Sequence, residues 1–137
     1  MMQGLSDPIL VDSAIYIDRL RAGHDIRQEL MPWLANGLLF NCGIVRGEVI
    51  RGFKNARLKA EMNAFFNIVP EVPTTARMWQ QIAELAWSLY RAAGGHRPLT
   101  DIIIARCAMH VGAVLISPDR HFEAIPGLKL RTALNAE

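Results

Sequence analysis

The chain has 137 residues, of which 51% are hydrophobic and 20% charged, with a formal net charge of +2. A chain of this length and composition can bury a core without disulfides or a structural metal, so we expect residues 1–137 to form a single ordered domain. No apolar run reaches the roughly 18 residues of a membrane span, and no basic region with a long apolar core begins the chain, so we expect a cytoplasmic protein without membrane contact.

The first part of the chain predicts two short strands and three helices. Apolar runs favour the strands, and small polar residues and glycines mark the beginnings and ends of the helices. The predicted elements are a strand at 9–11, a helix capped by Ser13 and ending at Gly23, a helix over 25–36, a strand at 38–40 and a helix over 44–52.

The second part continues this alternation. The predicted elements are a helix over 57–66, a strand at 68–69, a helix capped by Thr74 or Thr75 and ending at Gly94-Gly95, a helix capped by Thr100 and running to His110, a strand at 113–116 and a short strand near 128–130. Strands that alternate with helices predict an α/β fold, in which helices cover both faces of a central parallel sheet of four or five strands.

Acidic residues lie at the boundaries between apolar runs and helices. They are Asp12 after the run 9–11, Glu48 inside the segment 44–52, Asp101 before the run 102–105 and Asp119 after the run 113–118. In a parallel sheet, ligands bind beyond the carboxyl ends of the strands, where we expect Asp12 and Asp119. Taken singly, each acid is explained as a turn former, an early-turn acid or a solvated helical residue. Together they predict a pocket of carboxylates that a divalent cation would hold together.

The cysteines and aromatic residues suggest structural roles. Cys42 and Cys107 are far apart and lie in apolar segments, so we expect buried free thiols in a reducing compartment rather than a disulfide or metal site. Trp79, Trp87 and Tyr90 share the long helix after Pro73. An aromatic stripe at such a place is more typical of core or dimer contacts than of a platform for stacking bases.

Four short motifs contain the acids. In chain order they are Val11-Asp12-Ser13 followed by Ile15-Tyr16-Ile17-Asp18, then Glu48-Val49-Ile50-Arg51-Gly52, then Leu99-Thr100-Asp101-Ile102-Ile103-Ile104-Ala105, then Leu115-Ile116-Ser117-Pro118-Asp119-Arg120-His121-Phe122. In this order and spacing they resemble the PIN-domain ribonucleases, and most closely the VapC-type toxins of type II toxin–antitoxin pairs. The resemblance spans nearly the whole chain and implies a three-layer α/β/α PIN-like fold.

The resemblance also implies the residues of an active site. The family's acidic quartet, which would be catalytic and would bind Mg²⁺ or Mn²⁺, falls on Asp12, Glu48, Asp101 and Asp119. Ser13 and Ser117 match hydroxyl positions that support the acids. Ala14 and His121 depart from the pattern, because relatives often have a polar residue at the first position and a second acid at the other. The bound ion would lower the pKa of a coordinated water for attack on a phosphodiester.

These implications predict a metal-dependent endoribonuclease, the toxin of a type II toxin–antitoxin pair. Its substrate would be RNA, its protein partner a cognate antitoxin, and its assembly a homodimer. One alternative is a PIN nuclease of housekeeping RNA processing, which the absence of a neighbouring antitoxin gene would favour. Another is a PIN-like module that binds RNA or a partner without cleavage, although the presence of all four acids argues against it.

Basic residues crowd the segment around Glu48 and follow the fourth acid. Contact with RNA phosphates would involve Arg46, Arg51, Lys54 and Arg120. A solvated helical face, or a surface that pairs with an acidic antitoxin segment, explains the crowded segment as well. For Arg120, a salt bridge to a neighbour is the alternative.

Overall fold

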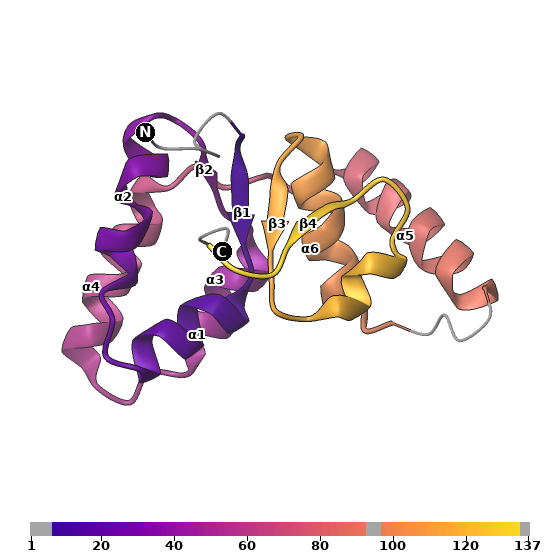
Figure 1. Ribbon diagram of the computed structural model, residues 1–137. Helices are drawn as coiled ribbons and strands as arrows, with labels where there is room; N and C mark the ends of the chain where they lie inside the picture. The colour runs from indigo at the N-terminus through magenta and orange to yellow at the C-terminus, as the bar shows by residue number, and fades with distance from the viewer. Residues whose placement is uncertain (1–6, 93–96, 135–137) are drawn as a thin grey trace.

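The structure, a computed structural model, describes residues 7–92 and 97–134. Short strands alternate with helices along the chain (Figure 1). In chain order the elements are β1 (Ile9–Val11), α1 (Ser13–Arg21), α2 (Ile26–Ala35), β2 (Leu39–Phe40), α3 (Gly43–Arg51), α4 (Ala56–Ile68), α5 (Ala76–Arg91), α6 (Leu99–His110), β3 (Val114–Ile116), the 3-10 helix η1 (Arg120–Ala124) and β4 (Lys129–Arg131).

The strands form one parallel sheet in the order β2-β1-β3-β4. Leu10 of β1 is aligned with Phe40 on one side and with Leu115 on the other, and Leu115 is aligned in turn with Leu130 of β4. Because every pair is parallel, the carboxyl ends of the strands lie at one edge of the sheet. The predicted α/β fold with a central parallel sheet is confirmed, and the sheet in the described part of the chain has four strands.

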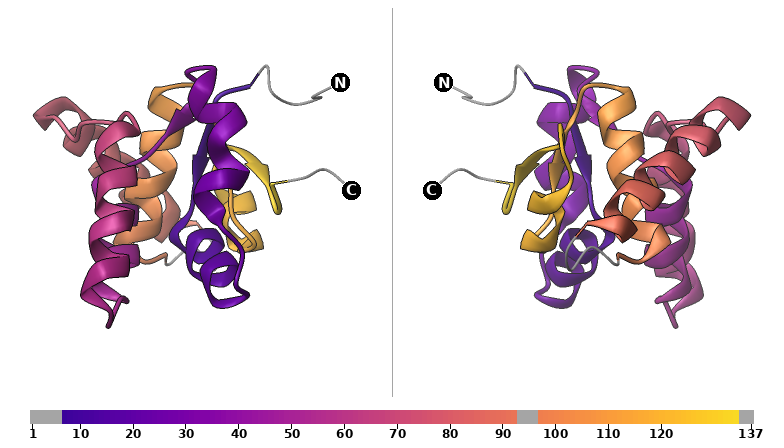
Figure 2. Two further views of the ribbon diagram at one scale, coloured as in Figure 1. Left: turned by 90° about the vertical axis from the view of Figure 1, so that its left-hand side faces the viewer. Right: turned by 90° about the vertical axis from the view of Figure 1, so that its right-hand side faces the viewer.

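The central strands β1 and β3 form the middle of the hydrophobic core. None of their residues is more than 6% exposed. Strands that are covered on both faces are apolar throughout, which is why both are visible in the sequence as uninterrupted apolar runs. Helix α6 packs on β3 and α5 on α6, whereas α2 packs on β2. Figures 1 and 2 show the resulting arrangement, with α5 and α6 on the side of β3 and β4 and α1, α2 and α4 towards the β2 side.

The predicted strand at 68–69 is wrong. Ile68 is the last residue of α4 and Val69 is its C-cap. The buried residues of this helix, Met62, Phe65 and Phe66, are followed by buried Val69, so the helical spacing of apolar residues continues to the end of the segment. The chain then meets the sheet through an isolated parallel bridge between Asn41 and Glu71.

The start of α6 also differs from the prediction. Pro98, not Thr100, is the N-cap, and Thr100 lies in the first turn. The carbonyl of Pro98 accepts hydrogen bonds from the backbone N–H groups of Asp101 and Ile102. These are the first hydrogen bonds of the helix, which therefore begins two residues earlier than a helix capped by Thr100. With either cap Asp101 lies in the first turn of the helix, where the positive end of the helix dipole favours a carboxylate.

Helix α5 is capped by Thr75, one of the two predicted threonines, whose Oγ1 accepts the N–H of Met78. The predicted end of this helix at Gly94-Gly95 lies outside the described residues. Trp79, Trp87 and Tyr90 are 44%, 59% and 69% exposed, so the core interpretation of the aromatic stripe is wrong. These large side chains instead lie on the surface of the molecule.

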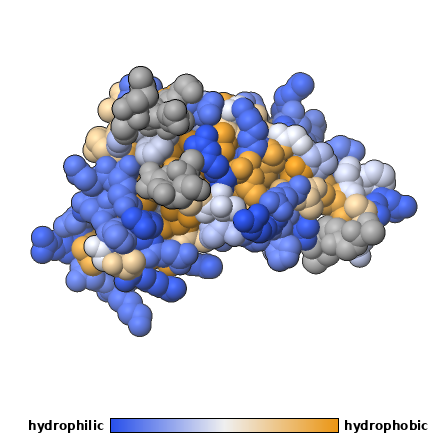
Figure 3. Space-filling model, in the orientation of Figure 1, coloured by the Kyte–Doolittle hydropathy of each residue, from blue (hydrophilic) through white to orange (hydrophobic). Residues whose placement is uncertain are grey.

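The two cysteines are buried free thiols, as predicted. Cys42 is the N-cap of α3 and Cys107 belongs to α6, and the neighbouring Cys107 thiol together with burial raises the pKa of Cys42. In the space-filling view, hydrophobic residues gather towards the centre of the face seen in Figure 3 and hydrophilic residues surround them. Within residues 7–92 and 97–134, no helix is both long enough and apolar enough to cross a membrane.

Candidate active site

The four predicted acids are held by four different parts of the fold. Asp12 directly follows β1, and Asp119 comes three residues after the end of β3. Glu48 lies in the middle of α3 and Asp101 in the first turn of α6. Because β1 and β3 are neighbouring parallel strands, Asp12 and Asp119 follow them at the same edge of the sheet. The expected position of the strand-end acids is therefore found.

Two serines connect these acids through hydrogen bonds. The Ser117 hydroxyl donates to Asp12 Oδ2 at 2.7 Å, and the Ser13 hydroxyl donates to Glu48 Oε1 at 2.7 Å. Ser117 Oγ also accepts the N–H of Asp119 at 3.2 Å. The network thus joins the loop after β3 to the end of β1, and the start of α1 to α3.

Asp12 is at the centre of this network. It is 7% exposed, and it is the N-cap of α1, in place of the predicted Ser13. Its Oδ1 accepts the backbone N–H of Ser13 at 2.8 Å while Oδ2 is bound by Ser117, so both oxygens have a protein donor. An aspartate can cap the helix in this way because its short side chain reaches back to the free N–H groups of the first turn.

Burial and mutual repulsion raise the pKa of two of these carboxyls. For Asp101, burial raises the pKa first, followed by the negative charges of Asp12, Asp119 and Glu48, while Arg97 acts in the opposite direction. For Asp12, burial also raises the pKa most, and Glu48 adds to the increase against the hydrogen bonds from the two serines. The negative charges of the three other acids therefore all act on Asp101 in the direction that raises its pKa.

The donor set fits Mg²⁺ or Mn²⁺. Within the described ranges, no group of three or more histidine, cysteine, aspartate or glutamate side chains is already placed to hold a metal ion. Mg²⁺ needs no such closed cage, because it prefers oxygen ligands, keeps several waters and is often bound by one or two carboxylates. A bound cation would also neutralise the negative charges of these carboxylates, which repel one another. The residues that would hold it are Asp12, Glu48, Asp101 and Asp119.

The predicted phosphate contacts fall into two groups. Arg46 and Arg120 already have protein partners: Arg46 donates to the side-chain oxygens of Asn63 and Asn67 on α4, and Arg120 lies 3.3 Å from Glu123. Arg46 also lies over the ring of Phe66, 5.9 Å from its centre. Arg51 and Lys54 are exposed near the end of α3. Of the four candidates, these two have the freer side chains for a phosphate.

His121, which departs from the family pattern, is paired with the fourth acid. Its Nδ1 lies 2.9 Å from Asp119 Oδ1, and its backbone N–H donates to the same oxygen at 2.9 Å. This N–H bond makes Asp119 the N-cap of η1. The position that holds a second acid in relatives thus carries a side chain that contacts Asp119 here. Ala14 lies in the first turn of α1 and offers no polar group.

Sequence reasoning missed two polar residues near this edge. Arg97 precedes α6 and is the cation that lowers the pKa of Asp101. Asn41 follows β2 and is 1% exposed, and neither polar atom of its side chain has a hydrogen-bond partner in the described structure. An unpaired buried amide is typical of a group that meets water or a ligand. The signal for Asn41 is the one that identified Asp12, a polar residue directly after an apolar strand.

Residues 9–128 match the family model of the PIN domain, which therefore covers most of the chain. The chain belongs to the PIN domain family. Proteins of this family are nucleases, enzymes that hydrolyse nucleic acids. The resemblance of the four acidic motifs to PIN-domain proteins is thus confirmed at the level of the family.

Solved structures of VapBC proteins share this fold. VapBC2 from Rickettsia felis, bound to a DNA fragment from its promoter, matches with 20% identity and a TM-score of 0.74. DNA-bound VapBC from Salmonella typhimurium matches with 22% identity and a TM-score of 0.74, and VapBC-1 from nontypeable Haemophilus influenzae with 20% and 0.70. Each match covers 90% of this chain and 96% of the other chain. None of the curated proteins compared with the chain matches it.

Proposed function

We propose that the protein is a metal-dependent endoribonuclease and the toxin of a type II toxin–antitoxin pair. The observation that supports the proposal is the hydrogen-bond network through which Ser13 and Ser117 join Asp12, Glu48 and Asp119 in a PIN domain. The fold neighbours named VapBC support the toxin assignment. The choice of RNA as substrate follows from the resemblance of the motifs to ribonucleases.

The chain's own residues would prepare the site for phosphodiester hydrolysis. Mg²⁺ or Mn²⁺ bound there would supply a water of lowered pKa and neutralise charge on the phosphate. Ser117 and the Ser13 N–H hold the two oxygens of Asp12, and the Ser13 hydroxyl holds Glu48. These bonds fix the orientation of both carboxylates before substrate arrives, so little ordering is needed at the moment of reaction. Arg51 and Lys54 would then contact phosphates along the RNA.

The test is cleavage of a mixed pool of transfer and ribosomal RNA by the purified chain. We expect discrete cuts with Mn²⁺ or Mg²⁺ and none when a chelator removes the metal, because the carboxylates alone repel the phosphate. A DNA pool of matched length serves as the control for substrate class. Cleavage that persists in chelator, or cleavage of DNA instead of RNA, would contradict the proposal.

We also propose an antitoxin partner, a homodimer and a cytoplasmic location. The buried free thiols agree with a reducing compartment. A groove suited to a partner helix lies between α1 and the end of α3. Its lining residues, mostly apolar, are Ile17, Leu20, Arg21, Val49, Gly52 and Phe53. Apolar grooves of this kind take up the apolar face of an amphipathic helix.

Phe53→Asp tests the groove. We expect the variant to arrest the growth of cells and to stay toxic when the product of the neighbouring gene is expressed with it, because a charge in the groove disfavours an apolar segment. Leu58→Asp on α4 is the matched control, since Leu58 is 48% exposed and is not among the residues that line the groove. The measurement is colony growth after induction. Rescue of Phe53→Asp as complete as that of Leu58→Asp would exclude the groove as the antitoxin site.

A further inference from the structure

Asp119 and His121 form a close pair at the start of η1. The His121 Nδ1 atom lies 2.9 Å from Asp119 Oδ1, and the backbone N–H of His121 donates to the same oxygen at 2.9 Å. The backbone bond caps η1, so the helix itself holds the two side chains next to each other. Imidazole and carboxylate groups are both metal ligands, which makes the pair a candidate for binding an ion.

The ring and the carboxylate are close without forming an aligned hydrogen bond. A separation of 2.9 Å is short enough for one, yet within residues 7–92 and 97–134 the ring of His121 donates no hydrogen bond to Asp119 Oδ1. The direction of the ring nitrogen is therefore what prevents the bond. Two ligand atoms that lie close together without pointing at each other are able to face a third atom.

The spacing of the two atoms suits one metal ion. Ligand atoms at about 2.1 Å from an octahedral ion lie about 3.0 Å from their neighbours in the coordination sphere. Asp119 Oδ1 and His121 Nδ1 have almost this separation. Both side chains are also open to solvent, with His121 77% and Asp119 40% exposed, so an ion reaches the pair without a change in the fold.

The pair is joined to the acidic site by hydrogen bonds. The backbone N–H of Asp119 donates to Ser117 Oγ, and the Ser117 hydroxyl donates in turn to Asp12 Oδ2. Asp119 and Asp12 are thus both bonded to one buried serine. An ion bound by Asp119 and His121 would therefore lie at the edge of the site that contains Asp12.

We propose that His121 is a ligand, with Asp119, of the metal ion that the site binds, and that its imidazole moves the preference of the site from Mg²⁺ towards transition metals. The proposal rests on the proposed metal-dependent function and deepens it by naming a ligand and an ion preference. Carboxylates and water suit Mg²⁺, whereas imidazole nitrogen suits transition metals such as iron, nickel and zinc. One nitrogen among oxygen ligands therefore changes the relative affinities of the site for these ions.

Orientation of Asp119 alone is a less suitable role for this ring. A histidine that only positions a carboxylate would donate its ring N–H to it, as metal-binding histidines do to their carboxylate partners. The ring of His121 is at the right distance but makes no such bond in the described part of the chain. A shared ion accounts for both the short separation and the missing hydrogen bond.

Metal binding without RNA tests the proposal. The purified chain is titrated separately with Co²⁺ and Mg²⁺ in a calorimeter, and the visible absorption of bound Co²⁺ is recorded because it depends on the ligand atoms. We expect His121→Gln to lower the Co²⁺ affinity about tenfold or more and to leave the Mg²⁺ affinity within about threefold. His121→Asp should bind Mg²⁺ more tightly than the native chain and change the Co²⁺ absorption, because an oxygen replaces the nitrogen.

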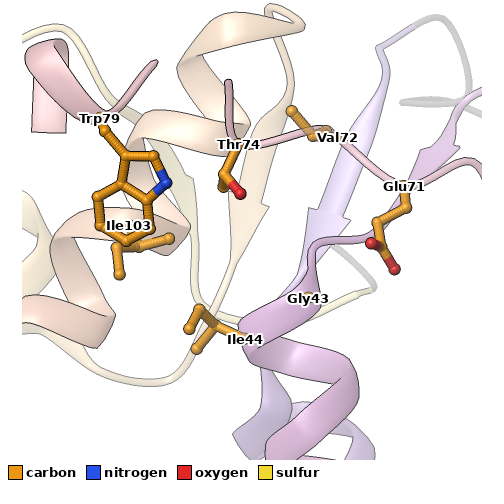
Figure 4. Close-up of a pocket in the computed structure, with 7 residues that line it drawn as sticks. All are labelled: Gly43, Ile44, Glu71, Val72, Thr74, Trp79 and Ile103. Carbon is orange, nitrogen blue, oxygen red and sulfur yellow. The ribbon is translucent and has the colours of Figure 1, made fainter. Parts of the chain in front are cut away.

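Two variants control for binding elsewhere on the surface. His110→Gln removes an exposed histidine at the opposite end of α6 from Asp101. Glu71→Gln removes an exposed carboxylate that lines a pocket with Thr74 and Trp79, and no histidine is among the described residues that line it (Figure 4). We expect both variants to bind Co²⁺ with the affinity and absorption of the native chain.

Several results would overturn the proposal. They are unchanged Co²⁺ affinity and absorption in His121→Gln, an equal loss in either control variant, an equal loss of Mg²⁺ and Co²⁺ binding in His121→Gln, and a native chain that does not bind Co²⁺. The outcome for the nuclease is separate, because no RNA is present. A chain that binds Co²⁺ through His121 but cuts no RNA would retain the ligand and contradict the nuclease, whereas metal-dependent cutting with unchanged Co²⁺ binding in His121→Gln would do the reverse.

Discussion

Asp101→Asn is expected to lower RNA cleavage by about a thousandfold, a loss typical of removing one preorganised electrostatic contact. The negative charges of all three other acids act on Asp101, so its carboxylate is the one that interacts electrostatically with each of them. Glu84→Gln on α5 is the matched control, because Glu84 is exposed and lies outside the site. The measurement is the single-turnover rate in Mg²⁺. A rate for Asp101→Asn within tenfold of the control would remove this acid from the catalytic set.

The same variant is expected to raise the melting temperature of the metal-free chain near neutral pH. The folded-state pKa of Asp101 lies above its ordinary value of 3.8, so ionisation destabilises the folded state as the pH rises from there through the folded-state pKa. Asparagine cannot ionise, so the variant does not lose this folding stability. The gain should be present at neutral pH, shrink as the pH falls and vanish below about pH 4, where the native carboxyl is protonated in both states. A lower melting temperature than that of the native chain at neutral pH would show that the acid is structural.

Ser117→Ala is expected to destabilise the metal-free protein by about 1–3 kcal/mol at neutral pH, the usual cost of a buried polar group that loses its partner. The fully buried hydroxyl donates to Asp12 Oδ2 and accepts the N–H of Asp119, so both would lose a partner. The bond lowers the pKa of Asp12, and its loss would raise that pKa further. The destabilisation should therefore be largest when Asp12 is ionised and diminish as the pH falls through its folded-state pKa.

Denaturant unfolding at several pH values measures this effect. Ser88→Ala is the control. Ser88 is exposed on α5, so this substitution removes a serine hydroxyl that faces solvent. The RNA cleavage rate of Ser117→Ala should also fall, because Asp12 and Asp119 lose the group that joins them. A cost equal to that of Ser88→Ala at every pH would contradict the role given to Ser117.

The sequence was most informative where burial in the tertiary structure requires the same residue types as the local strand conformation. β1 and β3 are covered on both faces, so their residues had to be apolar, and the runs that follow from this predicted both strands. Asp12 and Asp119 were predictable because a polar residue after such a run lies at the ligand edge of a parallel sheet. The strand predicted at 68–69 failed because a short apolar run at a helix end looks the same as a buried strand.

The sequence by itself determined the kind of fold and the family resemblance, and it gave the four acids as candidates for the site. Only the tertiary structure decided how these acids are held: Ser117 and Ser13 reach across 105 and 35 positions of the chain to Asp12 and Glu48. It alone showed that Arg97 opposes the acids at Asp101 and that the aromatic face of α5 is on the surface. The physical reason is that hydrogen bonds, charge interactions and burial depend on distances in space. Periodicity along a helix or strand records which face is apolar, but not what lies opposite it.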